Sequence, residues 1–477
     1  MKLVRNLLFL ASGETLSKIL TVVTIAYVAR VVGPAGFGHL EFAMSASLLV
    51  GVLVHQGLGL YGSREIARNP GQTETLVAEI ASLRFVLALI AYAGLIAFVY
   101  VVDRPAVSEQ LVLIYGLSLL FMPLGLEWVF QGHERMRTSA ALQVIRQAVF
   151  ALVVFALVRD QFDLWPVAIA EVAGVAAVAA TSIWLYRSQL HHRIRLPRTL
   201  SIKVIREGAV LGLSGLFWSA KIFGATVVVG LIGSEQDVGY FSAAMRVLVG
   251  LHAFIWLYFI NLLPTLSRGW AEDDTIELQT AQSMRLVAWF GVGGGLIWVL
   301  LSPAAIRVLY GADFMPAVPA LQWLGIVFVV VAIHGHYRFG LIAANRQRDE
   351  MMTSALGTVI SLSLIPLGYM TLGVTGAALA LLAGEVMILF SSWLFSRWQL
   401  SLGSELLFLI RPLICVAILF LVLQMLAGFV PLAAQVAIAV VWFAVAAYLT
   451  DSGMRLLAKE MVSSWLARRK AQAGDSQ

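Results

Sequence analysis

Charged side chains are scarce in this sequence of 477 residues: Asp, Glu, Lys and Arg make up 13% of it, whereas 60% of the residues are hydrophobic. Soluble globular proteins have about 25% charged and about 45–50% apolar residues. Because a soluble fold of this length still has a large surface to cover with polar groups, this composition excludes a soluble enzyme and a disordered chain. The single cysteine, Cys415, cannot form an internal disulfide, which excludes a disulfide-stabilised secreted domain. The composition indicates a polytopic membrane protein.

Long apolar runs recur along the whole chain. A helix needs about 20 apolar residues to cross about 30 Å of hydrocarbon. The runs are continuous rather than alternating, which favours helices over a transmembrane barrel. We therefore predict an all-α membrane protein with about 14 transmembrane helices. The predicted spans are 7–32, 37–60, 81–102, 109–130, 140–158, 165–186, 208–232, 239–264, 284–301, 319–343, 352–370, 375–395, 412–428 and 433–450.

Basic residues are distributed unequally between the two sets of connections. If the N-terminus is cytoplasmic, 22 of the 33 Lys and Arg residues lie in predicted cytoplasmic segments and three, Arg104, Arg159 and Arg307, in predicted external ones. Cytoplasmic connections carry such an excess of Lys and Arg in membrane proteins. The asymmetry predicts that both termini are cytoplasmic. It also explains the net charge of +6 without a nucleic-acid partner.

The two halves of the chain resemble each other at an offset of about 200–215 residues, which indicates an internal repeat. Four pairs of segments match in the same order: 33–44 with 233–245, 82–86 with 283–287, 136–140 with 351–355, and 182–186 with 391–395. Six spans per repeat give both halves the same orientation, so we expect two six-helix lobes related by a pseudo-twofold axis along the membrane normal. The predicted parts are an N-terminal lobe (1–190), a basic cytoplasmic linker (191–206), a C-terminal lobe (207–400), two additional helices (401–452) and a cytoplasmic tail (453–477).

Several charged residues fall inside predicted spans, where they usually face a protein interior or water. Lys221 lies mid-span, and Lys18 lies one turn after Glu14 on the same face, a spacing suited to an ion pair. Arg246 lies about two turns into its span. Each of these charges has two interpretations: a structural pair, or part of a cation-rich cleft between the lobes that attracts a negatively charged cargo. The candidates for the cleft are Glu14, Lys18, Lys221 and Arg246.

Four arginines are secondary candidates for the cleft: Arg30, Arg64, Arg146 and Arg338. Arg30, Arg84, Arg285 and Arg338 lie close enough to span ends for their side chains to snorkel to water. His334 and His336 diverge on a helix, which favours packing over metal binding. The sequence has no Gly-Lys dipeptide and hence no phosphate loop, and no nucleophile–base signature. We expect no catalytic residues, no metal site and no ATP hydrolysis.

Three stretches carry a family resemblance. The first is Asn6, Ser12-Gly13 and the Ala-Arg-Val-Val-Gly-Pro-x-Gly-Phe-Gly segment at 29–38; the others are Gly-x-Gly-x-x-Gly-x-Arg-Glu-Ile-Ala at 57–67 and Leu-Tyr-Gly-Ala-Asp-Phe at 309–314. Together with twelve plus two spans, they resemble the bacterial polysaccharide-biosynthesis transporters. These are O-antigen-type flippases of lipid-linked oligosaccharides, in the superfamily that includes multidrug and toxin extruders.

The resemblance implies a function and a set of partners. It implies alternating access in the bacterial inner membrane, with undecaprenyl-pyrophosphate-linked repeat units moved from the cytoplasmic to the periplasmic leaflet for O-antigen or exopolysaccharide synthesis. It also implies that a polysaccharide polymerase and glycosyltransferases act beside the chain. No cofactor is expected, and a gradient of protons or sodium ions and the membrane potential remain alternative driving forces.

Two transporters of the same superfamily remain as alternatives. A peptidoglycan-precursor flippase would share the fourteen spans and the cationic cavity. A multidrug extruder would concentrate carboxylates, whereas this chain places Lys221 and Arg246 on the helices that the resemblance assigns to the cavity.

Overall fold

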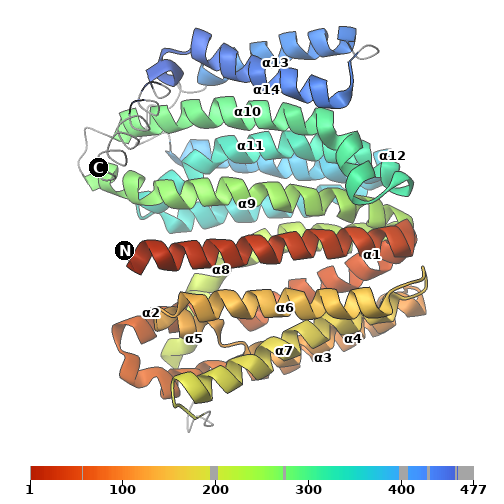
Figure 1. Cartoon of the computed structure of the whole chain (residues 1–477), viewed down its shortest axis with the longest axis vertical. Coiled ribbons are helices and arrows are strands. Elements are labelled where there is room, and N and C mark those ends of the chain that lie inside the picture. The colour runs from red at the N-terminus through yellow and green to blue at the C-terminus, as the bar shows by residue number, and fades with distance from the viewer. Residues whose placement is uncertain are drawn as a thin grey trace, which may run out of the picture. The chain divides into compact units, whose positions relative to one another are not determined.

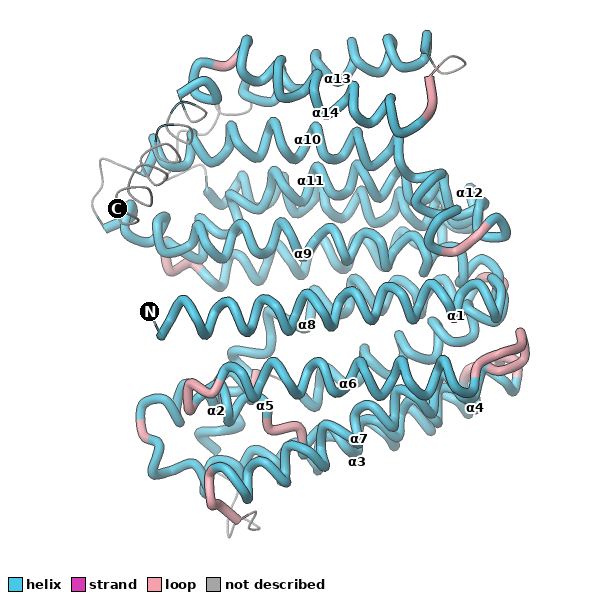
Figure 2. The backbone as a smooth tube through the Cα atoms, viewed as in Figure 1, coloured by secondary structure: helices cyan, strands magenta, loops and turns pink. Residues whose placement is uncertain are grey.

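All regular structure in the described part of the chain is helical (Figures 1 and 2). The computed structural model describes residues 2–55, 57–193, 202–271, 276–396, 407–426, 430–456, 459 and 463. The α-helices are α1 (Lys2–His55), α2 (Leu58–Arg68), α3 (Thr73–Val101), α4 (Ala106–Phe121), α5 (Glu127–Gly132), α6 (Met136–Leu157), α7 (Leu164–Gln189), α8 (Ile202–Ile232), α9 (Glu235–Ala271), α10 (Ile276–Leu309), α11 (Val318–Ala343), α12 (Gln347–Ser396), α13 (Leu407–Leu426) and α14 (Leu432–Thr450). Short 3₁₀ helices are η1 (Pro70–Gln72), η2 (Met122–Leu124) and η3 (Ala312–Ala317).

Within the described residues, eleven helical segments are long and apolar enough to cross a membrane. Two of them, Gly13–Arg68 and Gln347–Ser396, are double length and contain the breaks in α1 and α12. Counting these twice and adding the shorter apolar helix Phe408–Leu423 gives fourteen spans. The predicted fold class, an all-α polytopic membrane protein with about 14 transmembrane helices, is confirmed.

The break in α1 lies at Gly33, whose backbone angles are φ 70° and ψ 177°. A left-handed φ is open to glycine without the steric cost that a Cβ brings. Pro34 follows and lacks the N–H that a continuing helix requires. The Gly-Pro pair therefore separates the first two spans with no intervening loop. Gly373, at φ 59°, separates the two halves of α12 in the same way.

The contacts divide the chain into two compact units, which are described separately. Unit 1 comprises Met1–Ala243, Ile306–Ala317 and Leu362–Ala377; unit 2 comprises Ala244–Ala305, Val318–Ser361 and Ala378–Gln477. The two units are defined by contacts between residues and do not test the predicted boundaries of the lobes, which stay a prediction. Most of the predicted linker (194–201) and of the tail (464–477) lies outside the described residues.

In unit 1, α1 packs against α6, α4 and α8, while α4 and α6 both pack against α7. Figure 1 shows α3, α4, α6 and α7 running side by side. A core of large apolar side chains, including Ile80, Trp128 and Tyr186, joins the short helices α2 and α5 to α3 and α7. In unit 2, α10, α13 and α14 share a core built around Trp289, Leu419 and Phe443. The last two helices are thus anchored to α10 by apolar contact.

Candidate functional site

The predicted ion pair in the first span is present. Lys18 Nζ lies 2.8 Å from Glu14 Oε1, one helical turn away in α1, and the two side chains are 58% and 54% exposed. Lys18 precedes the Gly33 break by 15 residues, which corresponds to about 22 Å of helix at 1.5 Å per residue. Charged groups at this depth are costly in hydrocarbon and face water or protein instead. This face of α1 is therefore suited to border water or a polar cargo.

Lys221 is buried in α8, with 5% of its surface exposed. It lies 11 residues before Ile232, the last residue of α8, or about 16 Å along the helix. A lysine stem cannot reach an aqueous interface from that depth. Its neighbours Ser219 and Ile222 are also buried, and Lys221 has an interaction within the protein, so it is not an isolated charge. Its contact with a cargo stays a prediction.

The four primary candidates fall in different units. Glu14, Lys18 and Lys221 belong to unit 1, whereas Arg246 belongs to unit 2. Arg246 is half-buried in α9 and also interacts within the protein. The structure brings Glu14 and Lys18 together. That all four residues line one cleft stays a prediction.

Two secondary candidates form ion pairs between neighbouring helices. Arg146 of α6 contacts Glu171 of α7 through its guanidinium. Arg338 of α11 donates from Nε to Glu350 Oε1 of α12 at 2.9 Å and from Nη2 to the same oxygen. Ser354 also donates to this carboxylate, at 3.0 Å. These pairs hold α6 to α7 and α11 to α12, and a further role in binding stays a prediction.

The snorkelling expectation is wrong for Arg84. Arg84 is only 4% exposed and its guanidinium lies against Gly59 of α2. Arg338 is engaged by Glu350, itself 6% exposed at its side chain. A neighbouring helix covers Arg84, which a single apolar span cannot reveal, whereas the Arg338 side chain is 23% exposed and its snorkelling stays a prediction. Arg64, by contrast, is 42% exposed, with Glu65 at 3.6 Å and Glu207 at 3.8 Å.

A group of contacts that the sequence analysis did not predict surrounds the α1 break. Arg104, just before α4, lies 3.1 Å from Glu235 at the start of α9, with side chains 10% and 26% exposed. Arg104 Nη1 also donates to the Gly233 carbonyl at 3.2 Å, and its guanidinium lies 5.1 Å from the ring centroid of Phe42. All these residues belong to unit 1, at the end that the basic-residue asymmetry predicts to be external.

Aromatic rings pack beside this ion pair. Phe314 of η3 lies with its ring centroid 5.7 Å from Phe37, 5.4 Å from Tyr310 and 6.2 Å from Tyr240. Arg30 donates to the carbonyls of Arg307, Val308 and Leu309 in the last turn of α10, where carbonyls lack partners within the helix. The Arg307 carbonyl also accepts from the Gly311 N–H at 3.2 Å. We call these residues the external closure: Arg30, Phe37, Arg104, Glu235, Tyr240, Tyr310 and Phe314.

Two repeat-related glycines allow the backbones of the external closure to touch. A Cβ on Gly38 would overlap the carbonyl of Glu235, and a Cβ on Gly239 would overlap the carbonyl of Pro34. Tyr369 of α12 donates to Oδ2 of Asp237, in the first turn of α9, at 2.7 Å. Gly38 and Gly239 correspond in the two repeats, with one residue inserted in the second, and this correspondence was the sequence signal for the approach. Sequence alone did not show that the two glycines meet each other.

Unit 2 contains a buried polar network around α11. His334 Nε2 lies 2.8 Å from Glu385 Oε2, and both side chains are 2% exposed. His336 Nε2 lies 2.6 Å from Ser283 Oγ, which is 2.6 Å from Tyr258 Oη. The His336 ring also packs edge-on against Phe259, with centroids 4.9 Å apart. The two histidines diverge as predicted, and each makes a polar contact in addition to packing.

Comparison with known proteins places this chain among membrane transporters. A protein of Escherichia coli (strain K12) named as an O-antigen transporter is 22% identical over 414 residues, which cover 82% of this chain and 96% of that protein. Stage V sporulation protein B of Bacillus subtilis (strain 168) is 21% identical over 424 residues, covering 80% of this chain and 81% of that protein. The prediction of a transporter rather than an enzyme agrees with the name of the first relative.

Solved structures share the fold. The lipid II flippase MurJ in an inward closed conformation matches with a TM-score of 0.72 over 93% of this chain and 98% of its own, at 14% identity. An inward-facing multidrug resistance MATE family transporter of the MOP superfamily matches with a TM-score of 0.67 over 81% of this chain and 94% of its own, also at 14% identity. Residues 3–270, more than half of the sequence, match the family of polysaccharide biosynthesis proteins. The chain is a multi-pass membrane protein that belongs to the polysaccharide biosynthesis protein family.

Proposed function

We propose that the chain is a flippase that moves undecaprenyl-pyrophosphate-linked oligosaccharide repeat units from the cytoplasmic to the periplasmic leaflet by alternating access. The units would then be polymerised into O-antigen or exopolysaccharide. Family membership over residues 3–270 supports a role in polysaccharide synthesis. The relative named as an O-antigen transporter supports transport rather than catalysis.

The observation that carries the proposal is the exposed Glu14–Lys18 pair at the middle of the first span. A polar surface at this depth is suited to an oligosaccharide and its charged pyrophosphate, because both would lose hydration in hydrocarbon. Lys221 adds a cation on a second helix of unit 1. In a medium of low dielectric constant, such cations attract a pyrophosphate more strongly than they would in water. The polyprenyl tail could remain in lipid while its head group crosses.

The two alternatives of the sequence analysis have different requirements. A multidrug extruder has to bind cations, and a buried positive charge such as that of Lys221 would disfavour their binding. A peptidoglycan-precursor flippase would need the same cations, because its cargo also carries a pyrophosphate. The charges of this chain therefore favour a lipid pyrophosphate, and the sugar has to be identified by experiment.

The test of the proposal is a deletion strain complemented with variants of Lys221. The deletion should accumulate unpolymerised repeat units on the cytoplasmic leaflet and lose surface polysaccharide. Lys221→Ala and, more severely, Lys221→Glu should reduce export per molecule of inserted protein, while Lys221→Arg should retain part of it. Arg159→Ala, an exposed cation on the connection before α7, serves as the matched control.

Two outcomes would count against this assignment. Normal surface polysaccharide in the deletion strain, with no second transporter present, would remove the flippase function. If Lys221→Ala only lowered protein abundance, with export per molecule unchanged, Lys221 would have a structural role, since removing one member of a buried charge pair is destabilising by itself.

We propose further that the chain lies in the bacterial inner membrane with both termini in the cytoplasm. A cysteine at Ala312, which is exposed in η3, should then react with an impermeant reagent in intact cells, whereas one at Arg348 should not. The reverse labelling would contradict the orientation. The polymerase and glycosyltransferases that act on the same glycan are proposed partners, and a proton gradient, a sodium gradient or the membrane potential is proposed to supply the driving force.

A further inference from the structure

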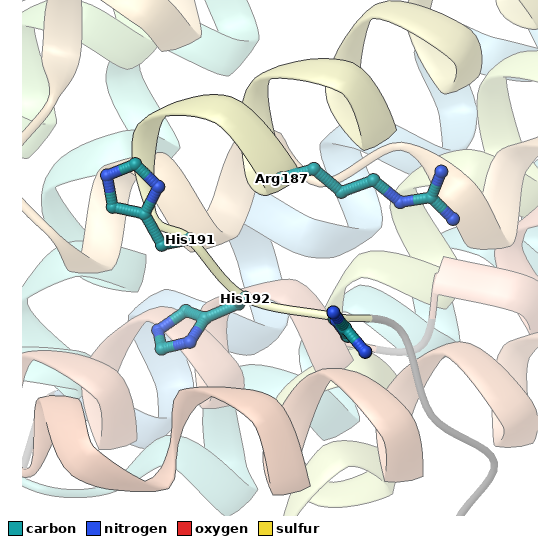
Figure 3. A pocket seen from close by; sticks show the side chains of 4 residues that line it. Arg187, His191 and His192 are labelled. Atoms are coloured by element: carbon teal, nitrogen blue, oxygen red, sulfur yellow. The ribbon is translucent and has the colours of Figure 1, made fainter.

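A basic pocket lies where α7 ends, separate from the charges discussed above. Arg187, His191, His192 and Arg193 line it, and its volume is about 500 Å³. Figure 3 shows Arg187, His191 and His192 around the end of this helix. His191 has a φ of 57°, so the chain turns sharply out of α7 between the first and the last of these residues. The turn gathers four basic side chains within seven residues. We call this site the α7 pocket.

The carboxylate beside the α7 pocket is already engaged. Glu74, in the first turn of α3, lies 3.2 Å from His192 Nδ1 and accepts a hydrogen bond from the Arg193 backbone N–H at 3.1 Å. The His192 ring packs 5.6 Å from the ring of the fully buried Tyr186. These contacts fix the backbone and one imidazole in place, so the floor of the pocket does not depend on a ligand.

The described part of the chain pairs no carboxylate with the guanidinium groups of the α7 pocket. Within the described ranges, neither Arg187 nor Arg193 forms an ion pair through its side chain, whereas Arg64 and Arg68 on α2 both contact Glu65. Arg135 approaches from the side, donating to Gln189 Oε1 at 3.1 Å. Burial, and then the charges of His192 and Arg135, lower the pKa of the nearby His133.

One feature of the site opposes anion binding. The C-terminal end of a helix carries roughly half a negative charge, and α7 ends here. Two full guanidinium charges outweigh this partial charge, and Arg187 lies in the last turn of α7, where it compensates the helix end directly. Guanidinium groups also bind phosphate oxygens in pairs, with matching planar geometry. The most suitable ligand is therefore a compact dianion or monoanion with several oxygens.

We propose that the α7 pocket binds the phosphate group of an anionic membrane lipid at the cytoplasmic face of the membrane. The volume of the pocket falls in the range of about 300–1,000 Å³ that is typical of small-molecule sites, enough for a glycerophosphate head group. Arg187 lies two residues before Gln189, the end of a membrane-length helix, and lipid phosphates lie near the ends of such helices in a bilayer. Basic pockets at the cytoplasmic ends of transmembrane helices bind such head groups in other proteins. This site is independent of the cargo, so it does not rest on the proposed transport function, although it rests on the proposed orientation of the chain.

The experiment uses the full-length protein in phosphatidylcholine nanodiscs, with native mass spectrometry to count bound lipid as phosphatidylglycerol is titrated. Wild-type protein should bind phosphatidylglycerol in preference to phosphatidylcholine. Arg187→Gln combined with Arg193→Gln should reduce the affinity at least about tenfold, because each cation near a membrane surface contributes to the attraction. The matched control is Arg159→Gln combined with Arg348→Gln, which removes the same charge from two exposed arginines elsewhere.

Three results would overturn the proposal. An equal loss of affinity in the control variant would show that net charge, rather than the pocket, attracts the lipid. Equal binding of phosphatidylcholine and phosphatidylglycerol would remove the requirement for an anionic lipid. Displacement of phosphatidylglycerol by millimolar inorganic phosphate would make free phosphate the ligand. Unchanged melting temperatures of both variants confirm that each comparison is made between folded proteins.

Discussion

Replacing Glu235 with Gln should open the external closure of unit 1. The substitution keeps the size of the side chain but removes the charge that faces Arg104 at 3.1 Å. Arg104 would keep its bonds to the Gly233 carbonyl and its contact with the Phe42 ring. Charge-assisted hydrogen bonds contribute about 1.5–3 kcal/mol, and these two side chains are largely shielded from water. A loss of about 2 kcal/mol would shift the closed-to-open equilibrium by about 30-fold.

Cysteine labelling from outside can measure this shift. Ala317, at the end of η3, is fully buried, so Ala317→Cys in a Cys415→Ala background reports opening, while the exposed Ala312→Cys reports access in general. The rate at position 317 should rise strongly with Glu235→Gln. Asp103→Asn, which removes an exposed carboxylate from the same connection, should leave the rate unchanged. Equal rates in all three proteins, with normal insertion, would show that the ion pair does not hold the closure.

Three further predictions concern separate contacts. Glu350→Gln should lower the melting temperature and abundance of the protein, because removing one partner of a buried ion pair costs about 3–5 kcal/mol. A combined replacement of Arg338 and Glu350 by apolar residues should recover part of this loss. A normal melting temperature of the Glu350→Gln variant would contradict the structural role of the pair. Gly38→Ala should reduce export because its Cβ overlaps the Glu235 carbonyl, whereas Gly94→Ala, which meets nothing within 4 Å, should not; equal export by both would refute the close approach. The backbone N–H groups of Arg159 and Asp160 donate to Asp163 and lower its pKa. These two amides should therefore be protected from hydrogen exchange at neutral pH and lose that protection as the pH falls through the lowered pKa of Asp163. Protection that is independent of pH would contradict these two hydrogen bonds.

The fold was predictable from the sequence because the bilayer imposes its dimensions on every helix. Apolar runs of about 20 residues recur, and Gly33-Pro34 marks a break that no other residue pair would tolerate as easily. The helices α1 and α12 each contain two of the predicted spans. Gly33 and Gly373 interrupt them between the predicted spans, so their length agrees with the prediction. The packing of one span against another was harder to predict from the sequence. Arg84 looked free to reach water from its own helix, and only the presence of α2 over it buries the side chain.

The candidate site was predictable where the interaction was local. The i to i+4 spacing of Glu14 and Lys18 specifies their pair, whereas Arg146–Glu171 and Arg338–Glu350 join different helices. Arg104 and Glu235 are far apart in sequence and each lies in an ordinary polar connection, so neither carried a signal of the other. His334 lies in an apolar run with no sign of Glu385, 51 residues later. To predict such pairs, one has to know how the helices are aligned with one another, and the hydrophobic periodicity of a single helix does not give that alignment.

The central claim is that this chain moves a lipid-linked oligosaccharide, and transport by the purified protein tests it most directly. Proteoliposomes would contain an undecaprenyl-pyrophosphate-linked repeat unit, and a glycan-cleaving enzyme added outside would report which molecules have reached the outer leaflet. Wild-type protein should make the inner pool accessible to this enzyme, and Lys221→Glu should not. The account is contradicted if the repeat unit stays in its original leaflet while a peptidoglycan lipid precursor, tested in parallel, is moved.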